Sequence, residues 1–384
     1  MHRGWAEARR IARDAVKPLE AVELSLAEAL GRALASPVRA LVPMPAYDNS
    51  AMDGYAVAGR GPWTLVGAVR AGGEPYPGVL APGTGIEIAT GAPVPPGTSA
   101  VLPVELAVHS GRRVSGEAVP GRHIRRRGED CPEGQELIAT ATTVTAAVLG
   151  AAAAVGHDTL LVHRRPRVSV VVTGDEIQAS GVPEPGHVRD AIGPMLPGLL
   201  EAAGADEHGL VRLADRPRAL TAALTDSDAD VVVVCGATSK GPADHLRGVL
   251  RALLADVRVD GVACRPGHPQ LLAVLPDGRC VVGLPGNPFA ALAAGLTLLS
   301  PLLLRLGGHR TPVPVSARAA THLPAHDEDT RLVPVAWAGN AVAPVGHDRP
   351  GSLWGAALAT ALAVVPPGFT GGDVELLPLP GGRH

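Results

Sequence analysis

Three glycine-rich turns in the second half of the sequence could position a ligand, and the second and third of them have the residue types that hold a phosphate or oxyanion. They are residues 173–176 (TGDE), 235–241 (CGATSKG) and 284–288 (LPGNP), and each follows an apolar run. Glycine lets the backbone approach a ligand, while free N–H groups and the positive start of the next helix attract negative charge. One such turn often serves only to reverse the chain. Three at one sheet edge favour a nucleotide-like ligand.

Charged side chains accompany these turns. Asp175 and Glu176 suit a divalent cation or ribose hydroxyls, with a solvated turn as the alternative. Arg265 and His268, in CRPGHPQ, form a cationic turn suited to an anion, with two surface residues beside a proline as the alternative. Neither the P-loop pattern GxxxxGK(S/T) nor the dinucleotide pattern GxGxxG is present, so the common NTPase and dinucleotide-binding functions lose their main support.

A second group of polar residues lies in the first third of the chain. Asp48 and Asp53 belong to PAYDNSAMDGYAV, Thr90 to ATGAPVPPG and Asp130 to RRRGED. Their types suit cation or phosphate binding. Their spacing leaves open whether they meet.

Two kinds of hydrophobic pattern must position these residues. From residue 166 onward, valine-rich runs such as RVSVVVT alternate with helical stretches, which predicts a parallel sheet covered by helices on both faces. Between about 41 and 138, short β-like runs are interrupted by Gly and Pro, which predicts a mostly β insert. Residues 1–40 have a helical period, a helix at about 142–156 is expected to pack on them, and a small β unit is expected after Gly308.

Composition excludes several function classes. The 384 residues are 46% hydrophobic and 18% charged with a net charge of −3, as expected of a globular protein with no field for nucleic acid or an anionic membrane. Four widely spaced cysteines without a CxxC pair favour reduced thiols. The apolar stretch 144–156, the longest that stands out, is too short to span a bilayer. We therefore expect a cytoplasmic protein with neither a nucleic-acid nor a membrane partner.

Taken in order, these segments resemble one family. The motifs PAYDNSAMDGYAV, IATGAPVPPGTSAVLPVE, GRHIRRRGEDCPEG, RPRVSVVVTGDEI, GPAD, RPGHP and GLPGNPFAAL follow the order seen in molybdopterin molybdenumtransferases, whose animal relative is the C-terminal domain of gephyrin. The resemblance extends over roughly residues 1–380. Seven separated motifs in one order make it specific.

The resemblance implies a reaction and an architecture. The reaction inserts molybdenum from molybdate into adenylylated molybdopterin, giving molybdenum cofactor and AMP with Mg²⁺ or another divalent cation. The protein is expected to be a homodimer with its site shared between subunits, and a molybdopterin adenylyltransferase is a candidate partner. The implied fold is multidomain α/β plus β: a helical domain I (1–40 and 139–162), a β insert as domain II (41–138), an α/β molybdopterin-binding domain III (163–308) and a C-terminal β barrel as domain IV (309–384).

The resemblance also assigns roles to residues. Catalytic roles fall to Asp53, Asp130, Glu176 and Asp244, of which Asp53, Glu176 and Asp244 are expected to hold the cation. Carboxylates suit the cation, backbone amides and the cationic turn suit a phosphate, and molybdate needs N–H, hydroxyl or arginine donors. Substrate contacts are expected from Thr90, Asp215, Gly236, Ser239, Lys240, Arg265, His268, Pro285 and Pro288.

The sequence departs from the family pattern in the molybdopterin half of the site. Arg265-Pro-Gly-His268 replaces the usual Lys-Pro-Gly-Lys, and Asp190-Ala-Ile192 replaces Asp-Thr-Asn or Asp-Ser-Asn. The favoured interpretation is a working enzyme whose cationic turn is rebuilt around Arg265, Lys240 and His268. The alternative is a paralogue without transferase activity that serves as a molybdopterin carrier or dimeric scaffold. An unrelated nucleotide-binding α/β protein is disfavoured by the motif order.

Overall fold

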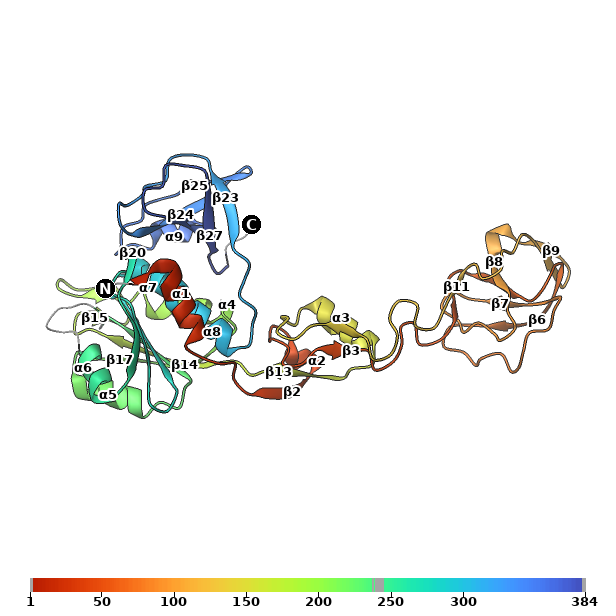
Figure 1. Cartoon of the computed structure of the whole chain (residues 1–384), viewed down its shortest axis with the longest axis horizontal. Coiled ribbons are helices and arrows are strands. Elements are labelled where there is room, and N and C mark those ends of the chain that lie inside the picture. The colour runs from red at the N-terminus through yellow and green to blue at the C-terminus, as the bar shows by residue number, and fades with distance from the viewer. Residues whose placement is uncertain (1–2, 237, 239–244, 382–384) are drawn as a thin grey trace.

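A computed structural model of the chain describes residues 3–236, 238 and 245–381. The molecule is extended (Figure 1). An α/β unit and a β barrel lie together at one end, a narrow linker unit follows, and a β insert forms the far end. The chain enters and leaves the linker unit twice, because the insert lies within it.

The α/β unit is built on a six-stranded sheet in the order β17-β14-β18-β22-β21-β19. The first four strands are parallel to one another, and β21 pairs antiparallel with both β22 and β19. The valines of β18 are fully buried, which is typical of a strand covered on both faces. The strands are β14 (Arg167–Thr173), β17 (Asp206–Leu213), β18 (Val231–Cys235), β19 (Asp256–Asp260), β21 (Leu271–Val274) and β22 (Cys280–Leu284), with a small pair β15 (Ile177–Gln178) and β16 (Val188–Arg189) beside them.

Helices cover both faces of this sheet, as the sequence predicts. Leu220 and Leu250 belong to a core on one face, beneath α5 (Pro217–Thr225) and α6 (Leu246–Ala252). A larger core on the other face contains Leu196 and Phe289. The elements over that larger core are α1 (Trp5–Asp14), η2 (Gly193–Met195), α4 (Leu196–Ala202), α7 (Pro288–Ala294), the single π-helical turn η3 (Gly295–Leu299) and α8 (Ser300–Leu306).

One helical segment of the described chain is long and apolar enough to cross a membrane by length and composition, namely residues 288–306. It is longer than the apolar stretch 144–156 that stands out in the sequence. Of its most apolar window, 78% is buried inside the protein. The segment is therefore a core helix of the α/β unit.

The expectation of helix throughout residues 1–40 is wrong. Helix α1 ends before Pro18 and packs against α8 and η3, where Trp5 Nε1 donates to Thr297 Oγ1 (3.1 Å). The segment Ala21–Ser25 alternates in burial with period two and forms strand β2. As expected, α3 (Ala146–Ala154) packs back on an N-terminal helix, α2. The linker unit comprises β2, α2 (Leu26–Ala29), β3 (Val38–Arg39), β12 (Glu136–Ile138), α3 and β13 (Thr159–His163).

The predicted β insert and C-terminal β unit are both present. The insert contains a sheet in the order β8-β5-β7-β6-β10-β9 and a separate pair, β11 with β4. Its elements are β4 (Asn49–Ser50), β5 (Gly54–Val57), β6 (Trp63–Val69), β7 (Thr84–Ile88), β8 (Ala100–Pro103), η1 (Val104–Leu106), β9 (Val108–Ser110), β10 (Arg113–Ser115) and β11 (Ile124–Arg125).

The C-terminal unit is a closed five-stranded barrel, because β26 pairs with both β27 and β24. Strand β20 (Val262–Arg265) connects it to the α/β unit by pairing with β24 on one side and β1 (Arg3–Gly4) on the other. The barrel elements are β23 (Val315–Ala319), β24 (Thr330–Ala338), β25 (Ala341–Pro344), α9 (Trp354–Leu358), β26 (Ala361–Val365) and β27 (Asp373–Pro378).

Candidate functional site

The carboxyl ends of three parallel strands meet at one edge of the α/β sheet. Thr173 Oγ1 at the end of β14 donates to the Cys235 carbonyl (3.1 Å), and the Gly236 amide donates to the Leu284 carbonyl (3.1 Å). Gly236 has a φ of +99°, and a Cβ added there would lie 2.5 Å from the Thr173 carbonyl oxygen. A Cβ on Gly286 would lie 3.5 Å from the Gly236 Cα. The three glycine-rich turns are therefore neighbours in space.

Three acidic residues gather at the β14 and β17 corner of this edge. The Asp215 amide donates to Asp175 Oδ1 (3.3 Å). Partial burial raises the pKa of Asp215, and the nearby charges of Glu176 and Asp175 raise it further, against a smaller opposing effect of His245. Carboxylates that repel one another in this way suit a hard divalent cation. Within one chain, however, no three His, Cys, Asp or Glu side chains of the described ranges are grouped so that they could hold a metal ion by themselves, so a cation here would need ligands from elsewhere.

Three predicted residues, Ser239, Lys240 and Asp244, lie outside the described residues. Their assignment to substrate and cation remains a prediction. Gly236 and His245, which flank this segment, are both on the α/β unit.

The β insert brings together a second set of predicted residues. Asp53 Oδ1 accepts from the Thr90 amide (2.7 Å) and the Thr90 hydroxyl (3.0 Å), and these bonds lower the pKa of Asp53 below its usual value. Asp48 accepts from the Arg127 amide (2.8 Å) and from Arg126 Nη1 (2.6 Å). These bonds join Asp53 to Thr90 and, separately, Asp48 to the Arg126–Arg127 segment. The exposed Asp53 carboxylate stays ionised and available.

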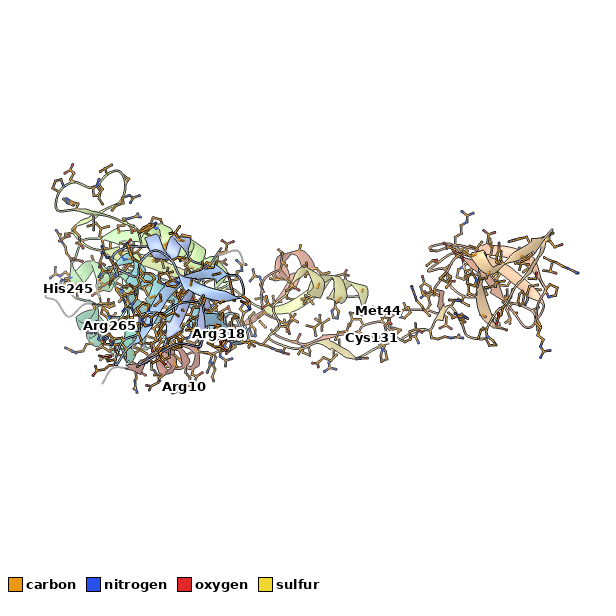
Figure 2. All side chains as sticks on the ribbon, turned by 90° about the horizontal axis from the view of Figure 1, so that it is seen from above. Arg10, Met44, Cys131, His245, Arg265 and Arg318 are labelled. Atoms are coloured by element: carbon orange, nitrogen blue, oxygen red, sulfur yellow. The ribbon has the colours of Figure 1, made fainter. Side chains whose placement is uncertain are left out.

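Asp130 lies where the insert joins the linker unit. Its amide donates to the Met44 carbonyl (3.0 Å), and its side chain is exposed. Met44 and the neighbouring Cys131 mark this junction in Figure 2, far from His245 and Arg265 at the other end. Asp53, Thr90 and Asp130 therefore do not meet Glu176 and Asp215 within one chain (Figure 1).

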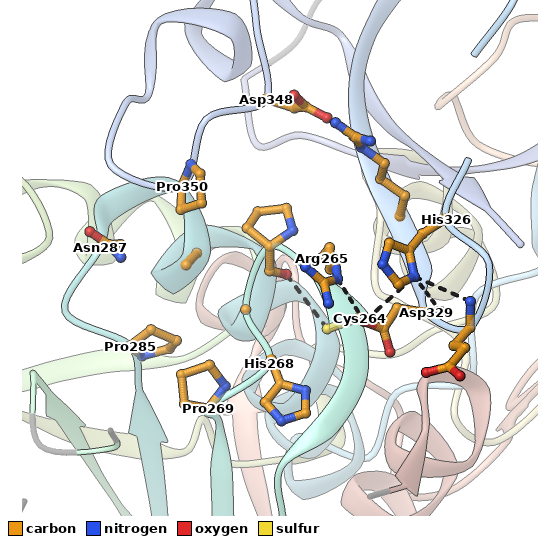
Figure 3. Close-up of a pocket in the computed structure, with 15 residues that line it drawn as sticks. Cys264, Arg265, His268, Pro269, Pro285, Asn287, His326, Asp329, Asp348 and Pro350 are labelled. Atoms are coloured by element: carbon orange, nitrogen blue, oxygen red, sulfur yellow. Dashed lines mark hydrogen bonds and ion pairs between the residues drawn. The ribbon is translucent and has the colours of Figure 1, made fainter. Parts of the chain in front are cut away.

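A cavity of about 730 Å³ opens between the α/β unit and the barrel (Figure 3). Three predicted residues line it, namely Arg265, His268 and Pro285. It also contains barrel residues that the sequence gives no reason to select, because no motif includes them. These are His326, Glu328, Asp329, Arg331 and Asp348.

The cationic turn at this cavity is held from behind by a buried amide. Gln270 is fully buried, and its Nε2 donates to the Gly267 carbonyl (2.8 Å) and to Cys264 Sγ (3.2 Å). The Gln270 backbone amide donates to the His268 carbonyl (2.9 Å). The turn therefore presents Arg265 and His268 from a fixed backbone, which suits anion binding.

Comparison with known proteins places these features in a family. Residues 3–156 match the MoeA N-terminal region (domain I and II), and residues 169–305 match a probable molybdopterin binding domain. A molybdopterin molybdenumtransferase of a Nostoc species is 32% identical over 96% of this chain and 90% of the relative. The chain belongs to the molybdopterin molybdenumtransferase family.

Other members of the family agree in sequence and in fold. Molybdopterin molybdenumtransferase 2 of Mycobacterium tuberculosis is 34% identical over 78% of this chain and 79% of the relative. A molybdopterin biosynthesis MoeA protein from Pyrococcus horikoshii superposes with a TM-score of 0.82 at 26% identity, covering 98% of this chain and 99% of that one. The extended arrangement of units is thus shared with this solved MoeA protein.

The departure from the family pattern at Ile192 has a structural explanation. Ile192 is 6% exposed and belongs to the large core of the α/β unit. Asp190, just before it, is buried; it accepts from the amides of Ile192 and Gly193 and from both Nε and Nη2 of Arg212 (2.9 and 2.7 Å). Ile192 therefore packs in the core where the family pattern has a polar side chain. Asp190 accepts hydrogen bonds from the first amides of η2.

The start of α7 differs from the expected phosphate cradle. Pro288 is the first residue of α7, and the amides of Phe289 and Ala290 donate to the Pro350 carbonyl of the barrel (2.9 and 3.2 Å). These two amides are satisfied by protein and are not free for a phosphate. The contact instead ties the barrel to the sheet edge.

Proposed function

We propose that this protein inserts molybdenum into adenylylated molybdopterin, giving molybdenum cofactor and AMP, in a site completed by a second copy of the chain. The observation that carries the proposal is the separation of two sets of carboxylates that could share one cation. Asp53 and Thr90 lie on the insert and Asp130 at its junction with the linker unit, whereas Glu176 and Asp215 lie on the α/β unit at the other end (Figure 1). An antiparallel pair of extended chains can bring both groups together twice, as two-fold symmetry requires.

The carboxylates fit a divalent cation by their chemistry. Glu176 and Asp215 would hold Mg²⁺ on the α/β unit, and Asp53 of a second copy would complete the set together with Asp244. When bound, the cation offsets phosphate charge as the phosphoanhydride of the adenylylated pterin opens. Thr90 keeps Asp53 ionised and oriented for this task through its two bonds.

The cavity between the α/β unit and the barrel supplies donors for tetrahedral anions. Arg265 and Arg331 are neighbours in the β20–β24 register, and His268 lines the same space. Guanidinium groups bind oxyanions in bidentate geometry, which suits molybdate or a terminal phosphate. Arg265 thus keeps the cationic role that lysine has in the family turn.

A carrier or scaffold function is the second candidate, and the position of Ile192 favours it. A side chain packed in the core cannot contact a pterin, so the molybdopterin half of the site has fewer polar groups than the family pattern provides. The intact Asp53–Thr90 pair favours the enzyme, because a scaffold has no need of it.

The test of the proposed function is single-turnover AMP release from adenylylated molybdopterin with magnesium and molybdate or tungstate. We expect oxyanion-dependent AMP release. Tight pterin binding without AMP release would contradict the enzyme function and favour the carrier or scaffold function. No binding at all would refute both.

Subunit mixing tests the shared site. Asp53→Asn and Glu176→Gln should each abolish AMP release when measured alone. Random mixing of the two variants should restore about a quarter of wild-type activity, because half of the dimers are mixed and each has one intact site. Mixing Asp53→Asn with itself is the control. Absence of recovery in mixed dimers that have been shown to form would contradict a site between chains.

We further propose that the reaction takes place in the cytoplasm and that a molybdopterin adenylyltransferase supplies its substrate. The four cysteines are all free and buried. Burial raises the pKa of Cys264 and of Cys280 to about 12, which keeps both as unreactive thiols. Such cysteines are typical of a reducing compartment.

A further inference from the structure

Two arginines of the cavity between the α/β unit and the barrel are held in the same way. Arg265 Nε donates to Asp329 Oδ2, and Arg331 Nε donates to Asp348 Oδ2, each at 2.7 Å (Figure 3). The arginines are register partners on the neighbouring strands β20 and β24. Across the described residues these are the only interactions recorded for either guanidinium.

The carboxylates lie behind the guanidinium groups. The Asp329 side chain is 15% exposed against 59% for Arg265, and Asp348 is 20% exposed against 31% for Arg331. Asp329 is itself fixed by His326, whose Nδ1 accepts from the amides of Glu328 (3.2 Å) and Asp329 (3.0 Å). Each arginine is thus bound by an aspartate that is more buried than the arginine itself.

The magnitude of such ion pairs argues against a purely structural role. Partly exposed pairs contribute little to stability. A guanidinium has five donors in a fixed fork, and binding through Nε leaves the terminal amino groups for another acceptor. A tetrahedral oxyanion accepts from such groups in pairs.

We propose that Asp329 and Asp348 are positioning residues, which aim the terminal amino groups of Arg265 and Arg331 into the cavity to clamp one tetrahedral dianion. The dianion is either the molybdate-type oxyanion or a phosphate group of the pterin substrate. The proposal rests on the proposed function for the identity of this ligand. The binding measurement below needs no turnover, so it can fail independently of that function.

The direction of the change in anion affinity shows whether Asp329 and Asp348 act by positioning the arginines or only through their negative charge. Asp329, Asp348 and Glu328 make the cavity more negative, and by Coulomb's law the removal of one of them should strengthen anion binding. If Asp329 positions Arg265, its removal should weaken binding instead. A loss of affinity is therefore expected only if orientation outweighs charge.

Calorimetric titration of the full-length protein with tungstate, and separately with inorganic phosphate, tests the proposal. We expect Asp329→Ala and Asp348→Ala each to weaken binding of at least one anion about tenfold, the range of one charge-assisted hydrogen bond. Asp329→Asn keeps an acceptor for Nε and should restore wild-type affinity or exceed it. Asp277→Ala, which breaks the exposed pair with Arg279, is the matched control and should change nothing.

Each outcome decides the matter. Loss of affinity for tungstate alone assigns the clamp to the molybdate-type oxyanion. Loss of affinity for inorganic phosphate alone assigns it to a phosphate group of the pterin substrate. Unchanged or tighter binding in both alanine variants would overturn the positioning role. If Asp329→Ala does not fold, Asp348→Ala and the asparagine variants carry the test. In turnover, the alanine variants should raise KM for the substrate whose anion the titrations assign to the clamp, with kcat nearly unchanged. Absence of AMP release in the wild type would defeat only the proposed function.

Discussion

At the scale of single residues, the carboxylates of Asp175, Glu176 and Asp215 repel one another, and a bound cation would offset this repulsion. Burial and the two neighbouring carboxylates raise the pKa of Asp215. A carboxyl whose folded pKa is raised contributes stability below its unfolded pKa of about 3.9, and that stability is lost as pH rises through the folded pKa. Ionised Asp215 at neutral pH therefore costs folded stability.

Glu176→Gln should accordingly raise stability while it abolishes turnover. Removal of one like charge lowers the pKa of Asp215 and should stabilise the ligand-free protein at pH 7 by up to about 1 kcal/mol, the range for partly exposed charges. The gain should shrink as pH falls toward 4. Thermal unfolding at both pH values measures it, with the exposed Glu201→Gln as the control. A destabilised Glu176→Gln at pH 7 would contradict this account.

At the scale of elements, the turn after β18 is where backbone geometry shapes the site. Gly236 combines a left-handed φ of +99° with close approach to the Thr173 carbonyl, whereas Gly286 in the adjacent turn has room for a Cβ. The end of β14 at Thr173 leaves no space for a Cβ on Gly236. Gly236 therefore requires glycine, whereas Gly286 tolerates a Cβ, and the two positions can be compared directly by substitution.

Gly236→Ala should destabilise the α/β unit by about 1–3 kcal/mol, the cost of a strained backbone position, and disturb the candidate site at this sheet edge. Gly286→Ala should stay within about 0.5 kcal/mol of wild type. Thermal unfolding and tungstate titration of both variants provide the comparison. Equal effects of the two substitutions would mean that the Gly236 backbone relaxes without cost.

At the scale of the whole molecule, the proposed shared site requires that the arm formed by the linker unit and the β insert keep its direction. Arg164, between the linker and α/β units, donates to both oxygens of Asp230 (2.6 and 2.7 Å) and also bonds Glu20. Burial alone would raise the pKa of Asp230, but the bonds from Arg164 and the Arg167 amide outweigh it and lower that pKa. The stability from this junction is present above the unfolded pKa of about 3.9 and is lost as pH falls through the lowered folded value.

Arg164→Leu should loosen the arm. It leaves the Asp230 carboxylate partly buried without its main partner, at a cost of about 1–3 kcal/mol. Limited proteolysis with mass spectrometry should show faster cleavage near residues 15–20 and 163–166, and AMP release should fall. Arg39→Leu, which breaks an exposed pair with Glu136 within the linker unit, is the control. Equal proteolysis of the two variants would contradict a junction role for Arg164.

The sequence by itself determined the classes of the units and the motifs they carry. Strand β6 (Trp63–Val69) coincides with the predicted run WTLVGAV, and β18 (Val231–Cys235) with a predicted valine run. These signals are local, because burial on one or both faces of a strand imprints a period on consecutive residues. Strand β17 (Asp206–Leu213) was not predicted, since it is a largely exposed edge strand with no such period.

The tertiary structure alone decided which of those residues work together. The pairing of β20 with β24 sets Arg265 beside Arg331, the folding of η2 takes Ile192 into the core, and the arm carries Asp53 away from Glu176. Each depends on contacts between segments far apart in the chain, and no local period encodes the partner of a strand or the direction of an arm. The physical reason is that a local pattern shows which face of a segment is buried. The site depends on which other segment packs against that face, and the local pattern does not contain this information.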